Sequence, residues 1–218
     1  MILQNILDKY LQDCRDKVRV VTEDPKFRVS EAGRCHLMRY WKRMGVEPTN
    51  PIEVSSLRVF EVGTIIHRWI QEALRESGCL LAEEMVVEDE HRRGHIDAVV
   101  RWDGKTIIYD FKTVSPSRFS GVISPSRNYR YQLYTYYLMY PGQVDDLILA
   151  YICKDDLLIA EVSLLQGDFQ RELDDVKRDW EGLIEGWIQG REPFPNPDSP
   201  VECYGCIYRT KCDTYTPL

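Results

Sequence analysis

The chain has 218 residues, of which 44% are hydrophobic and 29% are charged, a composition typical of a globular domain with one sizeable core. No apolar run approaches the ~20 residues of a membrane span, and the N-terminus lacks the basic region and cleavage site of a signal peptide. We therefore expect a cytoplasmic protein without a membrane partner. The net charge of −7 argues against a broadly basic nucleic-acid-binding surface. An acidic body can still carry a local basic groove, and its candidates are Arg92, Arg93, Arg118, Arg127 and Arg130.

Apolar residues recur at helical spacing along the first third of the chain. They predict an amphipathic helix over residues 1–20. A second helix is predicted over about 30–45, where Ser30 has the chemistry of an N-cap. A longer helix over about 55–78 contains His67.

From residue 80 the hydrophobic pattern changes to the alternation of β-strands. Asp103-Gly104 is a strong signal for a two-residue hairpin turn. Residues 115–128 read as a polar loop, and the prolines within 193–200 predict a stiff, extended linker. In order, the predicted elements are strands over 80–88, 95–102 and 105–114, a helix over 129–140, strands over 144–153 and 157–164, and a helix over 167–190.

This order of elements predicts an α/β fold in which helices flank a mixed central β-sheet. We divide the chain into an N-terminal helical region over 1–54, a core over 55–190 and a C-terminal segment over 191–218. The last segment, made of the proline linker and a cysteine cluster, is expected to pack on the N-terminal region.

Two carboxylates and a lysine lie close together on the predicted hairpin. Pairing about the turn brings Asp97 near Asp110, and strand alternation places Asp110 and Lys112 on one face with Phe111 on the other. Hard oxygen ligands of this kind suit Mg²⁺ or Mn²⁺, which polarise a phosphate and activate water. The alternative is a surface hairpin with a cross-strand ion pair.

Two helices contribute polar residues whose function is open on sequence alone. His67 lies in an otherwise apolar helix, where a histidine is more often a hydrogen-bonded core residue than a ligand. Gln132 and Tyr136 are four residues apart, so they share a helix face and can touch a substrate together or simply pack. Three more tyrosines of this segment can stack on bases or belong to the core: Tyr129, Tyr131 and Tyr134.

Taken in order, these residues resemble the motifs of RecB-like nucleases in the PD-(D/E)XK superfamily. The family pattern is a helical His, Gly-x-x-Asp, Asp/Glu-x-Lys and Gln-x-x-x-Tyr. The resemblance covers residues 63–137 and implies a restriction-endonuclease-like core; many relatives carry Glu at the position of Asp110, and the shorter side chain bears on metal preference. The matching residues are His67, Gly94 to Asp97, Asp110 to Lys112, and Gln132 to Tyr136.

The resemblance also implies a role for each residue. Lys112 would be catalytic, while Gln132 and Tyr136 would position DNA or the lysine. The implied metal ligands are His67, Asp97, Asp110 and the carbonyl of Phe111.

The chain has seven cysteines, and an odd number without an export signal argues against a disulfide framework. Cys203-x2-Cys206-x5-Cys212 offers three soft ligands for zinc or an iron–sulfur cluster, with Cys35 as the natural fourth. The remaining three are interpreted as ordinary buried thiols: Cys14, Cys79 and Cys153.

One distant cysteine followed by three C-terminal ones, around a RecB-like core, resembles the iron–sulfur RecB-like nucleases. That group includes the CRISPR adaptation nuclease called Cas-four, the AddB subunit and nuclease modules of replication helicases, and the length here fits the Cas-four type and its phage relatives best. The resemblance implies a cluster, in the 4Fe-4S form over the 2Fe-2S form, with zinc as the alternative. It would staple the C-terminal segment to the N-terminal region.

These motifs favour a metal-dependent deoxyribonuclease, an exonuclease on single-stranded DNA or DNA ends. Its implied setting is CRISPR spacer acquisition, with adaptation proteins as partners, or phage recombination and repair; the sequence does not indicate the oligomeric state. The alternatives are a non-catalytic DNA-binding or adaptor module and a zinc-stapled structural protein. Both leave the combination of Asp97, Asp110 and Lys112 without a purpose.

Overall fold

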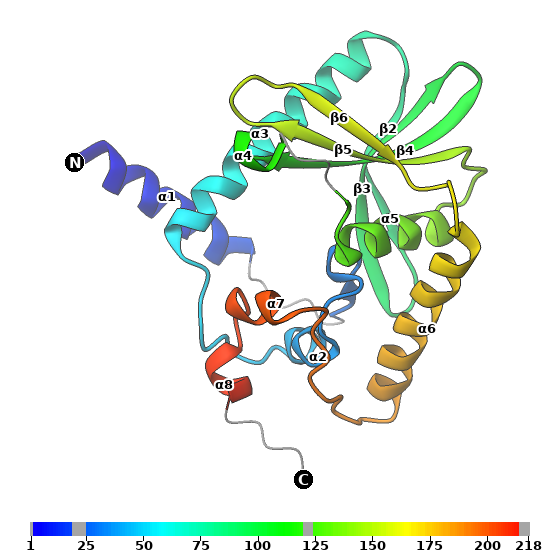
Figure 1. Cartoon of the computed structure of the whole chain (residues 1–218). Helices are drawn as coiled ribbons and strands as arrows, with labels where there is room; N and C mark the ends of the chain where they lie inside the picture. The colour runs from blue at the N-terminus through cyan, green and yellow to red at the C-terminus, as the bar shows by residue number, and fades with distance from the viewer. Residues whose placement is uncertain (1, 19–24, 120–123, 214–218) are drawn as a thin grey trace.

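The computed structural model describes residues 2–18, 25–119 and 124–213, without the side chains of residues 15–18. Figure 1 shows the strands gathered in one sheet, with helices on its faces and the short C-terminal helices at one end of the molecule. The helices are α1 Ile2–Val18, η1 Val29–Glu31 (a 3₁₀-helix), α2 His36–Arg43, α3 Val54–Glu76, α4 Pro116–Phe119, α5 Arg127–Met139, α6 Phe169–Ile188, α7 Pro200–Tyr204 and α8 Arg209–Asp213. The strands are β1 Phe27–Arg28, β2 Leu80–Glu88, β3 Arg92–Trp102, β4 Lys105–Val114, β5 Asp146–Cys153 and β6 Ile159–Ser163.

The sheet is mixed, as predicted. Its strand order is β1-β3-β4-β5-β6, and β2 also pairs with β3. The β1–β3 and β4–β5 pairs are parallel, whereas the β2–β3, β3–β4 and β5–β6 pairs are antiparallel. Asp103 and Gly104 both have positive φ, 47° and 75°, which is the backbone of a type I′ hairpin turn between β3 and β4.

Strand alternation sends buried side chains to two cores, one on each face of the sheet. On one face Ile66 and Ile70 of α3 pack with Phe111 and its neighbours from the strands. On the other face α5 and α6 pack against the sheet through Leu133, Tyr134, Tyr136, Leu173, Val176 and Trp180. The chain is thus an α/β layer structure with helices on both faces, in agreement with the predicted fold class.

The structure differs from the predicted elements at four places. Ser30 does not cap a helix: it lies in η1, and α2 begins at His36, directly after Cys35. Gly33 interrupts the helical pattern with a φ of +70°, beside the ring of Tyr131. The two-residue strand β1 was not predicted, α4 occupies part of the segment expected to be a loop, and α5 begins two residues early. Residues 120–123 of that loop lie outside the described residues.

The amphipathic helix α1 forms, but its apolar stripe is not buried. Arg58 of α3 donates to Asp8 Oδ1 at 2.6 Å and holds α1 beside α3. The apolar side chains of α1 stay largely exposed: Ile2, Leu3, Ile6, Leu7 and Tyr10. Among the residues that the structure describes, no helix is both long and apolar enough to cross a membrane.

The C-terminal segment packs on the N-terminal region. Tyr208 is buried against Trp41, and its hydroxyl donates to the Val46 carbonyl at 3.0 Å. The proline linker is also fixed to α2: Trp41 Nε1 donates to Glu192 at 2.9 Å, and the His36 backbone N–H donates to the Asn196 side chain at 2.6 Å. Ordinary hydrogen bonds and packing therefore join the two ends.

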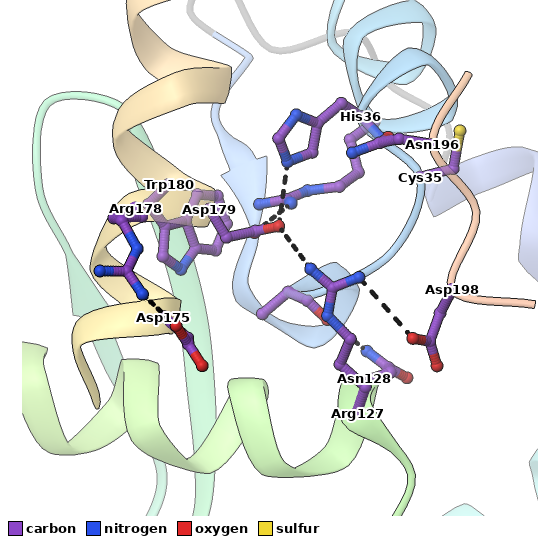
Figure 2. A network of polar contacts seen from close by, with 12 residues as sticks. Cys35, His36, Arg127, Asn128, Asp175, Arg178, Asp179, Trp180, Asn196 and Asp198 are labelled. Carbon is purple, nitrogen blue, oxygen red and sulfur yellow. Dashed lines mark hydrogen bonds and ion pairs between the residues drawn. The ribbon is translucent and has the colours of Figure 1, made fainter. Parts of the chain in front are cut away.

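A buried carboxylate, Asp179 of α6, ties the same region to the core (Figure 2). It accepts hydrogen bonds from His36 Nε2 at 3.0 Å and Arg39 Nη1 at 2.8 Å, both from α2. Arg127, the first residue of α5, reaches it at 3.5 Å and also lies 3.7 Å from Asp198 of the linker. One carboxylate thus fixes α2, α5, α6 and the linker relative to one another.

This network predicts a loss of stability in acid. Burial alone would raise the pKa of Asp179, but His36 and Arg39 outweigh it and lower the pKa to about 2. Because the folded-state pKa is depressed, the stabilisation is fully present above about pH 4 and is lost as the pH falls towards 2. Urea unfolding should therefore show a decline of roughly 2 kcal/mol across this window from this group. An Asp179→Ala variant is expected to lack this decline. An identical decline in both proteins would contradict the assignment to Asp179.

Candidate active site

The β3–β4 hairpin brings the two predicted carboxylates together. The paired ladder ends at Ala98 opposite Tyr109, so Asp97 and Asp110 are the next residues on the two strands. The Phe111 backbone N–H donates to Asp97 Oδ2 at 2.7 Å, which fixes the side chain of Asp97 across the end of the hairpin.

Asp110 lies at the buried centre of the site. Its side chain is fully inaccessible to solvent, and its Oδ2 is 2.5 Å from Lys112 Nζ. Its Oδ1 accepts a hydrogen bond from Gln132 Nε2 of α5 at 2.7 Å. The ammonium of Lys112 also lies 3.4 Å from Gln132 Oε1 and over the ring of Tyr129, 4.9 Å from its centroid. Gln132 therefore orients both the carboxylate and the lysine.

Tyr136 supports Gln132 from the next turn of α5. Gln132 Nε2 donates to the Tyr136 hydroxyl at 3.2 Å, and this hydroxyl donates to the His95 carbonyl at 2.6 Å. The approach is possible because residue 94 is glycine: a Cβ there would lie 2.7 Å from the Tyr136 ring and 2.7 Å from Val29. The glycine of the Gly-x-x-Asp motif is thus a packing requirement for the Gln-x-x-x-Tyr helix.

Gly94→Ala is therefore expected to destabilise the protein by about 1–3 kcal/mol through overpacking. Chemical denaturation would measure the loss, and the displaced Tyr136 should lower any activity of the site as well. Gly182→Ala in α6 is a matched control, since its Cβ would meet no atom within 4 Å. Equal stability of Gly94→Ala and wild type would show that Tyr136 does not need this approach.

His67 of α3 reaches the site from the other face of the sheet. Its Nδ1 is 3.8 Å from Asp97 Oδ2, and its ring packs edge-on against Phe111 with centroids 5.5 Å apart. Burial, and next the charge of Lys112, lower the pKa of His67. The imidazole is therefore neutral at physiological pH, the form in which histidine binds metals.

The electrostatics of the site reflect two carboxylates crowded beside one lysine. Burial, reinforced by the neighbouring Asp110, raises the pKa of Asp97 to about 8. Burial would lower the pKa of Lys112, but Asp110 and Asp97 outweigh it and raise that pKa, so the ammonium stays charged. Because two carboxylates share one lysine, a bound cation would favour the ionised form of Asp97.

A comparison with protein families matches the segment that carries most of these residues. A sequence model of the PD-(D/E)XK nuclease superfamily matches residues 90–213, more than half of the chain. The chain belongs to the PD-(D/E)XK nuclease superfamily. The matched region contains Asp97, Asp110 and Lys112, whereas His67 and Cys35 precede it. No curated protein matches the sequence significantly.

Two solved structures share the fold of this PD-(D/E)XK nuclease. SSO0001 is similar with a TM-score of 0.60 at 20% sequence identity, over 100% of this chain and 98% of that chain. A candidate exonuclease from Eubacterium rectale is similar with a TM-score of 0.52 at 12% identity, over 89% of this chain and 90% of that chain. At these identities the likeness shows the architecture and nothing about the substrate.

PD-(D/E)XK nucleases use divalent metals, and the donor chemistry of the site fits such a group. Asp97 and Asp110 supply hard oxygens, and Asp110 Oδ2, buried without a hydrogen bond, has the ammonium of Lys112 as its ion-pair partner. Over residues 2–18, 25–119 and 124–213, however, no three His, Cys, Asp or Glu side chains are close enough together to form a ready-made metal-binding set. The donor side chains lie in one region, but they are not close enough together for one cation to contact three of them as they stand.

The four cysteines predicted to bind a cluster also lie near one another. Cys35, Cys203, Cys206 and Cys212 all line one small cavity of about 60 Å³ beside α2. Burial raises the pKa of each of the three C-terminal thiols, and the proximity of Cys35 acts on all three in the same direction. The structure thus brings the four predicted cysteines together. Among the described residues, however, no three of them are close enough to form a metal-binding set as they stand.

Two of the tyrosines that could contact DNA belong to the core, and most of the candidate arginines have ion-pair partners. Tyr131 and Tyr134 are buried in the core, so they do not stack on bases, and Tyr134 donates to the Leu164 carbonyl at 3.0 Å. Four of the five arginines named for a basic groove are ion-paired on the protein itself: Arg92 with Asp89, Arg93 with Glu88, Arg127 with Asp179 and Asp198, and Arg130 with Glu172.

Sequence reasoning missed two residues beside the carboxylates, Gln71 and Glu84. Gln71 lies four residues after His67 on the same face of α3, a spacing that identifies it once His67 is placed in the site. Glu84 is opposite Asp97 only because of the pairing of β2 with β3, which has no local signal in the sequence.

Proposed function

We propose that this PD-(D/E)XK nuclease is a Mg²⁺- or Mn²⁺-dependent deoxyribonuclease that degrades single-stranded DNA or DNA from its ends. The observation that carries the proposal is the convergence of Asp97, Asp110 and Lys112 at the end of one hairpin. The nuclease family supports phosphodiester hydrolysis, and the resemblance to Cas-four-type proteins supports a cytoplasmic role in CRISPR adaptation or phage recombination.

Asp97 and Asp110 would hold the divalent cation, with the imidazole of His67 and the backbone carbonyl of Phe111 on the α3 side. When bound there, the cation supplies Lewis-acid activation of the phosphodiester. Lys112 directs its charged ammonium into the same place and stabilises negative charge that develops on the phosphate. Gln132 keeps Lys112 and Asp110 in position, and Tyr136 keeps Gln132 in position.

Linear and circular single-stranded DNA of equal length would test whether the enzyme needs an end. An exonuclease degrades the linear form with Mn²⁺ present and leaves the circle intact. Equal degradation of both would replace the exonuclease with an endonuclease while leaving the family assignment unchanged.

We further propose that Cys35, Cys203, Cys206 and Cys212 hold an iron–sulfur cluster, in the 4Fe-4S form. Their convergence on one partly buried cavity and the preference of thiolates for iron–sulfur clusters or zinc support this. Because hydrogen bonds such as that of Tyr208 to Val46 also hold this junction, the cluster would reinforce the contact between the two ends without being its sole cause.

Cys206→Ser is expected to remove most of the bound iron from protein purified without oxygen, and to lower the melting temperature because ligation contributes to folding. Elemental analysis and thermal melting would measure both effects. Cys14→Ser, on α1 and not among the residues that line this cavity, is the matched control. Stoichiometric zinc in the wild type, lost in Cys206→Ser, would replace the cluster with a zinc site.

A further inference from the structure

Glu84 has an unusual backbone for a residue within a strand. Its φ is +45°, although β2 is otherwise extended and Glu84 is not glycine. A non-glycine residue in this region is strained, and such strain persists only where its surroundings hold it. The ladder places Glu83 opposite Ala98 and Met85 opposite Ile96, so Glu84 lies across from Asp97.

The group that holds Glu84 is the buried amide of Gln71. Gln71 Nε2 donates to Glu84 Oε1 at 2.9 Å and to the Asp97 carbonyl at 2.8 Å. Gln71 is 4% exposed and lies one helical turn after His67. One amide therefore joins the glutamate to the strand that carries a predicted metal ligand.

Exposure rises steadily from the centre of the site towards Glu84. The side chain of Asp110 is 0% exposed, that of Asp97 14%, that of His67 24% and that of Glu84 54%. Glu84 is thus at the solvent side of the Asp97–His67 pair. Its charge acts on both neighbours, raising the pKa of Asp97 and opposing the lowering of the pKa of His67.

The Glu84 carboxylate, which accepts a hydrogen bond from Gln71 and lies 3.9 Å from His95 Nδ1, would repel a phosphodiester, which is itself an anion. A cation between the two reverses this effect. Lys112 already neutralises Asp110, with its ammonium 2.5 Å from Asp110 Oδ2, and this leaves Asp97 and Glu84 without a lysine or arginine ion-pair partner among the described residues.

We propose that Glu84 is an additional acidic group of the divalent-cation site and that Gln71 is the positioning residue that places it. Glu84 draws Mg²⁺ or Mn²⁺ to the solvent side of Asp97, and Gln71 fixes its carboxylate and the Asp97 backbone in one geometry. This inference rests on the proposed function, because it concerns the cation of the same site.

The test is calorimetric titration with Mn²⁺ alone, without DNA. It uses anaerobically purified protein from which divalent cations have been removed. Glu84→Gln is expected to weaken Mn²⁺ binding about 10-fold, the scale of the loss when a supporting group of a metal site is removed. Glu83→Gln is the matched control: it makes the same change one residue away, where the carboxylate pairs with Arg75 on the surface. Melting curves of all variants confirm that they are folded.

Gln71→Met tests the positioning role. It should weaken Mn²⁺ binding in the wild-type background and have a smaller effect when Glu84 is already glutamine, because coupled residues are not additive. Equal losses in both backgrounds would show that Gln71 acts independently of Glu84.

The outcomes separate this inference from the proposed function. Unchanged Mn²⁺ affinity in Glu84→Gln, with binding abolished in Asp97→Asn, would overturn the role of Glu84 and leave the nuclease site standing. Absence of Mn²⁺ binding in the wild type, or equal binding in Asp97→Asn, would overturn both.

Discussion

Replacing Lys112 with methionine is expected to reduce Mn²⁺-dependent DNA cleavage by a factor of about 10²–10³ or more. Methionine keeps most of the length and volume of lysine but removes the ammonium that lies 2.5 Å from Asp110 Oδ2. The lost group is the one positive charge that the described residues direct at the paired carboxylates, so negative charge on the reacting phosphate would lose its stabilisation. Single-turnover cleavage of end-labelled single-stranded DNA would measure the effect on chemistry.

The matched control is Lys105→Met, which makes the same change at the exposed start of the same strand. It should cleave at the wild-type rate. Because Lys112 is buried with Asp110, its removal leaves a carboxylate without its partner, and melting curves must show that the variant is folded at the assay temperature. Wild-type cleavage by folded Lys112→Met would remove the lysine from the reaction.

Replacing Asp179 with alanine is expected to cost about 3–5 kcal/mol of stability. Arg39 is fully buried, stacks over Trp180 with 4.0 Å to the ring centroid, and finds its carboxylate partner in Asp179. Without that partner a guanidinium remains buried and uncompensated, and His36 and Arg127 lose a common acceptor. Denaturation with urea would measure the loss.

Asp175→Ala provides the comparison, since it removes a carboxylate from the same helix one turn earlier (Figure 2). Asp175 pairs with Arg178 on the exposed surface, where such pairs contribute at most about 1 kcal/mol. A loss below about 1 kcal/mol in Asp179→Ala would show that water or a rearranged partner replaces the carboxylate.

The sequence predicts the centre of the site because local chemistry determines its geometry. Asp103-Gly104 specifies the turn, the turn specifies the pairing of β3 with β4, and strand alternation then orients Asp110 and Lys112 together. The spacing of Gln132 and Tyr136 gives the shared face of α5 in the same way. Each of these relations spans only a few residues or a single turn.

What the sequence does not predict depends on contacts between distant segments. The carboxylate of Glu84 is held by Gln71 of α3, and Asp179 acquires its role from α2 and the first residue of α5. Strand β1 has two residues, too few for a periodic signal, and is defined only by pairing with β3. Cys35 could be named as the fourth cysteine from ligand number, but only the fold places it beside the C-terminal three.

The most direct test of the central proposal is cleavage of end-labelled single-stranded DNA by the anaerobically purified protein, in Mn²⁺ and in a chelator, beside Asp110→Asn. The metal site proposed here predicts degradation by the wild type with Mn²⁺ only, and none by Asp110→Asn that is folded. Degradation in the chelator, or by the variant, would contradict the site. A folded wild type that binds Mn²⁺ and leaves the DNA intact would contradict the enzyme and favour a non-catalytic DNA-binding module.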